Sequence, residues 1–192
     1  MRGYVSCVLG CPYEGAVAPE TVAAVARRLL DETGCFEVSL GDTIGAGTPL
    51  ATGAMLRALL DPPAAGGAAA VRAERLAVHF HDTHGCALAN ILVALQHGIA
   101  TVDAAAGGLG GCPYAPGAAG NVATEDVVRM LDGMGIASGV DLDALLDAIE
   151  LIDAELPRPA GASAVVSKTA AALRARRRKQ QQQHEELEEQ QA

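Results

Sequence analysis

The chain has 192 residues and a formal net charge of −9, and 50% of its residues are hydrophobic. That length allows one domain with a sizeable core, and the acidic balance argues against a nucleic-acid-binding surface. No apolar run approaches the roughly 18 residues that span a bilayer, and no secretory signal is visible. The five cysteines are an odd number, which indicates reduced thiols rather than a disulfide framework.

Strands and helices are predicted to alternate from the start of the chain. Residues 3–9 read as a buried strand because they are short, apolar and bounded by glycines. A helix over 19–34 begins with a proline and ends with a glycine. A second strand is expected over 36–40, and Thr48 then predicts the N-cap of a helix that runs to about residue 60.

Two more strands follow in the middle of the chain. A loop over 61–73, rich in Ala, Gly and Pro, leads to a third strand over 76–81. Apolar residues spaced at a helical period from Leu88 predict a third helix that ends at Gly98. Residues 99–105 read as a fourth strand.

The rest of the chain is predicted to be helical, apart from a glycine-rich loop over 107–114. A fourth helix is expected over 124–134 and a further helix over 141–156. The last stretch, 157–192, joins a basic segment, a glutamine run and an acidic segment, and reads as a solvated tail, helical or disordered. Its basic patch either contacts an anionic partner or has no specific role. We therefore expect one β/α domain over 1–156 followed by this tail.

Side chains with metal-binding or catalytic chemistry follow the predicted strands. His79 and His81 are two residues apart on a strand, so their imidazoles point to the same face and can hold one metal ion. The alternative is one hydrogen-bonded core histidine and one exposed histidine. Asp42, Cys112 and Asn121 also come after strands. This pattern is typical of a parallel β/α fold with its site at the carboxyl ends of the strands.

Six segments of the sequence carry a resemblance to a known family: 2–7, 10–15, 39–45, 79–83, 108–114 and 121–126. Over about residues 2–155 the chain resembles the hydroxymethylglutaryl-CoA lyases, a metal-dependent family built on a TIM barrel. The His-x-His-Asp motif is shared with related Claisen-type synthases, whereas the Gly-Gly-Cys-Pro-Tyr loop is more specific to the lyases. Against eight strands in a TIM barrel, we count four here. The resemblance therefore implies an α/β fold that is the C-terminal half of a TIM (β/α)8 barrel, with about four β/α units and extra C-terminal helices.

The resemblance also implies a reaction and a cofactor. His79, His81 and Asn121 would bind a divalent cation, Mg²⁺ or Mn²⁺, with Zn²⁺ possible on ligand grounds. The reaction would be the retro-Claisen cleavage of 3-hydroxy-3-methylglutaryl-CoA to acetyl-CoA and acetoacetate, a step of leucine catabolism and ketone-body formation. Asp42 or His79 would take the proton of the tertiary hydroxyl. Cys112 on the glycine-rich loop would protonate the acetyl-CoA enolate.

Three further residues match family positions near the acyl-CoA substrate: Ser39, Thr43 and Glu125. Each has an alternative role of similar weight. Ser39 can supply strand polarity, Thr43 can bond within a turn, and Glu125 can be an acid in the first turn of a helix.

The resemblance leads to expectations about activity and assembly. The chain begins where the family's fifth strand begins, and the family's Arg-Asp pair on the first strand has no counterpart, so we expect very low activity of the chain alone. Open sheet edges predict a homodimer or association with another chain. A Claisen-type acyl-CoA synthase, or a non-catalytic partner of a full-length lyase, is the alternative function. The resemblance implies a mitochondrial location, with a cytoplasmic one as the alternative, because no targeting signal is visible.

Overall fold

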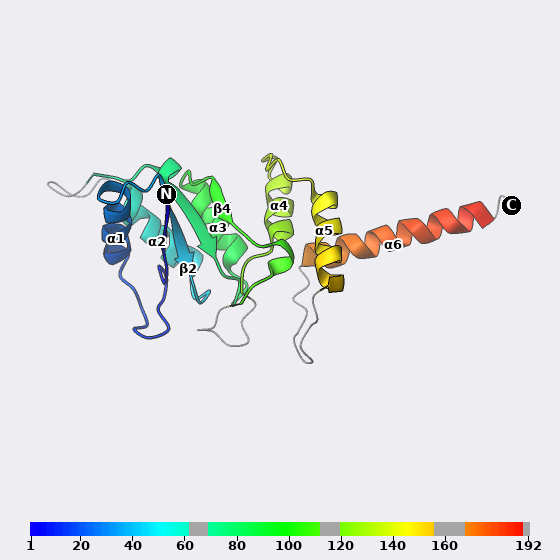
Figure 1. Ribbon diagram of the computed structural model, residues 1–192, viewed down its shortest axis with the longest axis horizontal. Helices are drawn as coiled ribbons and strands as arrows, with labels where there is room; N and C mark the ends of the chain where they lie inside the picture. The colour runs from blue at the N-terminus through cyan, green and yellow to red at the C-terminus, as the bar shows by residue number, and fades with distance from the viewer. Residues whose placement is uncertain (62–68, 112–119, 156–167, 190–192) are drawn as a thin grey trace. The chain divides into compact units, whose positions relative to one another are not determined.

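The computed structural model describes residues 1–61, 69–111, 120–155 and 168–189, and its first part is a parallel sheet with helices packed against it (Figure 1). The sheet runs in chain order through β1 (Arg2–Val5), β2 (Glu37–Asp42), β3 (Leu76–Phe80) and β4 (Thr101–Asp103). The connecting helices are α1 (Pro19–Asp31), α2 (Pro49–Leu60) and α3 (Ala87–Gln96), and a short 3-10 turn, η1 (Ala73–Arg75), precedes β3. All neighbouring strands are parallel, as the alternation of strands and helices predicts.

Most predicted elements are confirmed with ends that differ by a few residues. Helix α2 begins at Pro49, and the Thr48 side chain accepts a hydrogen bond from the Ala51 N–H, as an N-cap does. Strand β1 is shorter than predicted. Its chain turns away at Cys7, which has a φ of 59°, in the left-handed region that strands do not use. The Cys7 N–H instead donates to Thr43 Oγ1 at 2.9 Å.

The two faces of the sheet differ in chemistry because successive side chains of a strand alternate between them. One face is apolar and packs against the helices: α1 contacts β1 and β2, α3 contacts β3, and α2 packs between the two helices. It is formed by buried side chains from the two central strands, namely Val38, Leu40, Leu76, Val78 and Phe80. The other, which we call the polar face, carries Ser39, His79 and Asp103. Hydrophobic burial thus fixes which side chains are left for a site.

Asp42 is the last residue of β2, and its side chain lies on the helix-covered side of the sheet. Its register partner is Phe80, and its side chain is buried. Oδ1 accepts the Ala46 N–H at 3.1 Å and Oδ2 accepts the Gly47 N–H at 2.8 Å. Burial raises the pKa of the Asp42 carboxyl, and these N–H donors lower it in part. A Cβ on Gly47 would lie 2.7 Å from Asp42 Oδ2, so only glycine permits this approach. The carboxylate therefore shapes the connection from β2 to α2.

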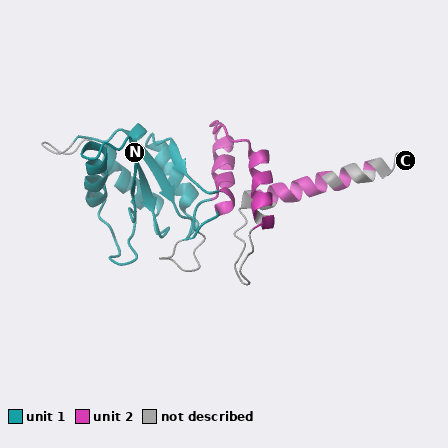
Figure 2. Ribbon diagram, in the orientation of Figure 1, with its two compact units in different colours: residues 1–105, 109–122 teal, residues 106–108, 123–192 magenta. Residues whose placement is uncertain are grey.

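The remaining helices form a second compact unit. Contacts divide the chain into residues 1–105 with 109–122, and residues 106–108 with 123–192 (Figure 2). The second unit holds the short turn η2 (Ala106–Gly108), α4 (Thr124–Gly133), α5 (Leu142–Glu155) and α6 (Lys168–Glu189). The chain passes from the first unit to the second between 105 and 106 and again between 122 and 123. The predicted domain over 1–156 with its tail stays a prediction. Across the described part of the chain, no helix is both long and apolar enough to cross a membrane.

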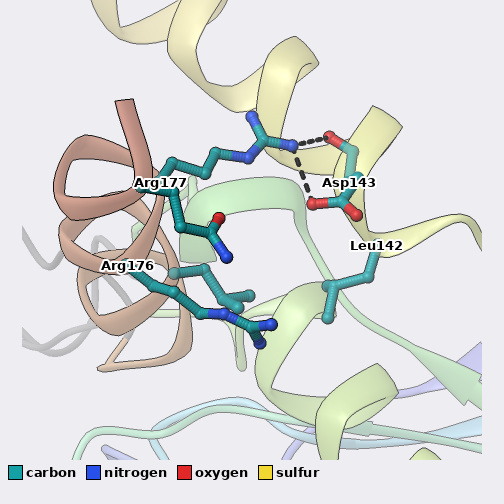
Figure 3. Close-up of a pocket in the computed structure, with 6 residues that line it drawn as sticks. Leu142, Asp143, Arg176 and Arg177 are labelled. Carbon is teal, nitrogen blue, oxygen red and sulfur yellow. Dashed lines mark hydrogen bonds and ion pairs between the residues drawn. The ribbon is translucent and has the colours of Figure 1, made fainter. Parts of the chain in front are cut away.

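Helices α5 and α6 are joined by ion pairs in this second unit. Arg177 donates to Asp143 Oδ1 at 2.8 Å and to Asp147 Oδ1 at 2.5 Å. A pocket of about 390 Å³ lies beside these pairs (Figure 3). Its lining comprises Leu142, Asp143, Leu173, Arg176, Arg177 and Gln180. Part of the basic segment of the tail is therefore neutralised within the chain.

The two phenylalanines test how far the apolar face supports the fold. Phe80 is 1% exposed and Phe36 is 64% exposed. We expect Phe80→Ala to lower the free energy of unfolding by about 3–5 kcal/mol, because it leaves a cavity in the core. Phe36→Ala, the matched control, should change it by less than about 0.5 kcal/mol. Urea denaturation followed by circular dichroism measures both, and equal effects would contradict the assignment of the core.

Asp42 offers a second stability test. Asp42→Asn keeps the size of the side chain but leaves one of the two backbone N–H groups facing an amide NH₂. We expect a loss of about 1–3 kcal/mol in the free energy of unfolding, since a buried donor is left unpaired. The control is Asp31→Asn on α1, where the carboxylate is exposed and its loss should be nearly neutral. A fully stable Asp42→Asn protein would show that these hydrogen bonds contribute little.

Candidate metal and catalytic site

The histidine pair lies at the carboxyl end of β3. His79 Nε2 and His81 Nε2 are 3.3 Å apart, and the ring centroids are separated by 5.2 Å. His79 is half-buried and His81 is buried. Burial lowers the pKa of His81, and the neighbouring His79 lowers it further, so His81 is neutral at physiological pH. Neutral imidazole is the form that binds metal ions.

The polar face brings charged residues from other strands next to His79. Asp103, its register partner on β4, places Oδ2 3.9 Å from His79 Nδ1. Ser39 Oγ donates to the same oxygen at 2.7 Å, and Arg2 Nη1 donates to Asp103 Oδ1 at 2.8 Å. Arg2 also donates through Nε to Glu37 Oε2 at 2.5 Å. Sequence reasoning identified Ser39 but missed Arg2, Glu37 and Asp103. The sequence did contain a signal for these three residues, because each is a charged residue at an alternating position of a short strand.

Asn121 is brought beside His81 by the chain that returns past the end of β3. The two residues form an isolated antiparallel bridge, and partners in such a bridge point their side chains to the same side. Asn121 Nδ2 donates to the Leu109 carbonyl at 2.9 Å. That bond fixes the orientation of the amide. It leaves Asn121 Oδ1 buried without a hydrogen-bond partner. A buried, unpaired carbonyl oxygen is costly unless a ligand satisfies it.

The donors present fit a divalent cation. Two nitrogens that bind one ion at about 2.1 Å, at angles between octahedral and tetrahedral, lie about 3.0–3.4 Å apart. The 3.3 Å between the two Nε2 atoms is within this range. Within the described residues, no group of three or more His, Cys, Asp or Glu side chains forms a metal cluster. A cation held by the two histidines would therefore need an oxygen donor such as Asn121 Oδ1.

Backbone N–H groups donate to side-chain oxygens of three other predicted residues: Asp42, Thr43 and Glu125. Asp42 lies on the helix-covered side of β2 with both carboxylate oxygens bonded to backbone N–H groups. Thr43 Oγ1 accepts the Cys7 N–H. Glu125 is buried in the second unit, where its Oε2 accepts the Gly107 N–H at 3.0 Å and its Oε1 has no hydrogen-bond partner. Cys112 lies outside the described residues.

Comparison with known proteins gives the context for this geometry. A family model described as HMGL-like matches residues 2–152. The mitochondrial hydroxymethylglutaryl-CoA lyase of Arabidopsis thaliana is 58% identical over 87% of this chain and 34% of its own length. The chain spans about a third to a half of the length of this relative and of the two solved structures described below.

Two solved structures share the fold. The hydroxymethylglutaryl-CoA lyase of Pseudomonas aeruginosa matches with a TM-score of 0.80 and 53% identity, over 91% of this chain and 54% of that chain. An HMG-CoA lyase of Acinetobacter baumannii in complex with coenzyme A and 3-methylmalate matches with a TM-score of 0.70 and 37% identity, over 80% of this chain and 47% of that chain. The expected α/β fold and part-barrel architecture are confirmed. The chain belongs to the HMGL-like family, and its relatives from Arabidopsis thaliana and Pseudomonas aeruginosa, at 58% and 53% identity, are hydroxymethylglutaryl-CoA lyases.

Proposed function

We propose that this chain is the part of a hydroxymethylglutaryl-CoA lyase that holds the catalytic cation. The reaction is the cleavage of 3-hydroxy-3-methylglutaryl-CoA to acetyl-CoA and acetoacetate. One observation carries the proposal: two imidazole nitrogens 3.3 Å apart at the carboxyl end of a parallel strand, in a chain whose relatives carry the lyase name. The carboxyl ends of strands are where barrels of this type carry their active sites.

His79, His81 and the side-chain oxygen of Asn121 are the proposed ligands of the cation. Mixed nitrogen and oxygen donors suit Mg²⁺ or Mn²⁺. A bound cation would stabilise negative charge on the tertiary oxygen of the substrate as the carbon–carbon bond breaks. The unpaired Asn121 Oδ1 and the neutral His81 support this ligand set.

The two candidate bases, His79 and Asp42, lie on opposite faces of the sheet. The Asp42 carboxylate is on the helix-covered side, where each of its oxygens accepts one backbone N–H. His79 lies on the polar face, with the Asp103 carboxylate beside its Nδ1. Nε2 would hold the cation throughout the cleavage, so His79 could accept the hydroxyl proton only at its other ring nitrogen, Nδ1. Which of the two residues is the base stays a prediction.

The remaining roles rest on the resemblance. Cys112 is proposed as the acid that protonates the acetyl-CoA enolate, since a thiol with a pKa of about 8.5 is mostly protonated at neutral pH. Ser39 is on the polar face and is retained as a substrate contact, whereas Thr43 and Glu125 bond to the backbone. An acyl-CoA substrate agrees with the relative solved with coenzyme A. The mitochondrial location and the homodimer stay predictions.

Metal binding tests the proposal directly. The chain, stripped with a chelator, is titrated with Mn²⁺ by isothermal calorimetry. We expect His79→Ala and His81→Ala to weaken binding more than about tenfold, because each removes a nitrogen ligand. His97→Ala is the control, since the His97 ring bonds to the Val93 carbonyl at the end of α3. Equal Mn²⁺ affinity in all variants would contradict the ligand assignment.

Turnover tests the reaction class. The chain is incubated with 3-hydroxy-3-methylglutaryl-CoA and Mg²⁺ or Mn²⁺, and acetoacetate is measured. We expect any release to require the cation and to be lost in His81→Ala and Cys112→Ala. A parallel assay with acetyl-CoA and a 2-oxo acid covers the synthase alternative. Acetoacetate release that survives removal of the cation, or condensation in place of cleavage, would overturn the proposal.

A further inference from the structure

The two ring nitrogens of His79 face different groups. Nε2 lies 3.3 Å from His81 Nε2, and Nδ1 lies 3.9 Å from Asp103 Oδ2. His79 and Asp103 are partners in the register of β3 and β4, so both side chains leave the sheet on the polar face. The ring is therefore held between a second imidazole and a carboxylate.

The Asp103 carboxylate is oriented by two other strands. Ser39 Oγ on β2 donates to Oδ2 at 2.7 Å, and Arg2 Nη1 on β1 donates to Oδ1 at 2.8 Å. Arg2 is itself held through its Nε by Glu37. The side chains of Arg2 and Asp103 are 23% and 21% exposed, so solvent screens this network only in part. Each carboxylate oxygen thus has a bonded partner and a fixed direction.

A carboxylate decides which nitrogen of a facing imidazole carries the proton. It accepts hydrogen bonds and does not donate them, and a neutral imidazole has one N–H and one lone pair. The 3.9 Å between His79 Nδ1 and Asp103 Oδ2 is longer than a hydrogen bond, so Asp103 acts through its negative charge. That charge favours the proton on His79 Nδ1, which leaves the Nε2 lone pair directed toward His81. In the cation-free chain His81 then carries its own proton on Nε2 and donates it across the 3.3 Å contact, and a cation bound at this Nε2 would displace that proton. Histidines that bind metals commonly show the same division, with the second N–H given to a carboxylate.

We propose that Asp103 is a positioning residue of the histidine pair. Its carboxylate selects the Nδ1-protonated tautomer of His79 and keeps the Nε2 lone pair available. The inference rests on the proposed function only for what uses that lone pair, a divalent cation. The tautomer itself is a property of the cation-free chain.

Nuclear magnetic resonance of the histidine rings tests the tautomer. The full chain is labelled with ¹⁵N, stripped with a chelator and held at about pH 8, where histidines are neutral. Two-bond ¹⁵N–¹H correlations identify the protonated nitrogen of each ring, and His79→Gln assigns the His79 signals. We expect His79 to be protonated at Nδ1 and His81 at Nε2. In Asp103→Asn the His79 ring should change to a mixture of tautomers or to the Nε2-protonated form.

The control variant removes the other carboxylate of the same network. Glu37→Gln also weakens the hold on Arg2 but leaves Asp103 facing His79, so the His79 tautomer should stay as in the wild type. If Asp103→Asn does not fold, Ser39→Ala loosens Oδ2 while keeping the charge, and the Nε2-protonated fraction should rise. The proposal fails if wild-type His79 is protonated at Nε2. It also fails if the folded Asp103→Asn protein, or Ser39→Ala in its place, keeps the wild-type tautomer.

Mn²⁺ affinity links the tautomer to the proposed function. We expect Asp103→Asn to bind Mn²⁺ about 10- to 100-fold more weakly than the wild type, Asp103→Glu to recover part of that loss, and Glu37→Gln to bind nearly normally. If wild-type His79 is Nδ1-protonated but no protein binds Mn²⁺, the proposed function fails and the positioning role stands. If Mn²⁺ binds equally to wild type and Asp103→Asn, the positioning role fails and the proposed function stands.

Discussion

The ion pair between Arg2 and Asp103 joins the first strand to the fourth across the polar face. Three strand spacings separate these strands, about 14 Å along a flat sheet. Side chains stand roughly perpendicular to a flat sheet, so they would not meet at 2.8 Å across that distance. The contact therefore agrees with a sheet that curves with its polar face on the inside. This is the curvature of a barrel, and here polar side chains bridge the inside.

This curvature concentrates charge where the histidine pair ends β3. Asp103 uses one oxygen for Arg2 and the other for Ser39, and the second oxygen also faces His79. The same residue thus belongs to the fold and to the candidate site. A substitution of Asp103 that breaks the Arg2 contact would affect the curvature of the sheet. A substitution that keeps the Arg2 contact would affect only the His79 ring. The Asp103 carboxylate therefore contributes both to the packing of the sheet and to the surroundings of the candidate site.

The alternation of side chains also gives different surroundings to residues of the same type at the ends of strands. Asp42 and Asp103 both end strands, and both carboxylates have two hydrogen-bonding partners. Asp42 lies among the helices and orders a loop through backbone N–H groups, whereas Asp103 lies on the polar face and bonds side chains. A single step along a strand moves a side chain to the opposite face. The position of each aspartate in its strand therefore decides whether it can meet the histidines.

Much of the architecture followed from the sequence. Helix α2 matched its Thr48 cap and proline start, and the spacing of His79 and His81 placed them on one face, because local backbone preferences and strand periodicity act over a few residues. The end of β1 could not be predicted from the sequence, since the left-handed backbone of Cys7 is held by Thr43, 36 residues away. The same limit applied to Asp42, whose role depends on the face that the helices cover.

The sequence by itself determined the order of strands and helices, the family and the paired histidines, since these depend on composition, period and motif. Tertiary structure decided that Asp103, Arg2 and Glu37 join the polar face and that Asp42 leaves it. It also decided that Asn121 lies beside His81, through a bridge between segments 40 residues apart. These contacts join residues distant in sequence, and the direction of a side chain there depends on the register and curvature of the whole sheet.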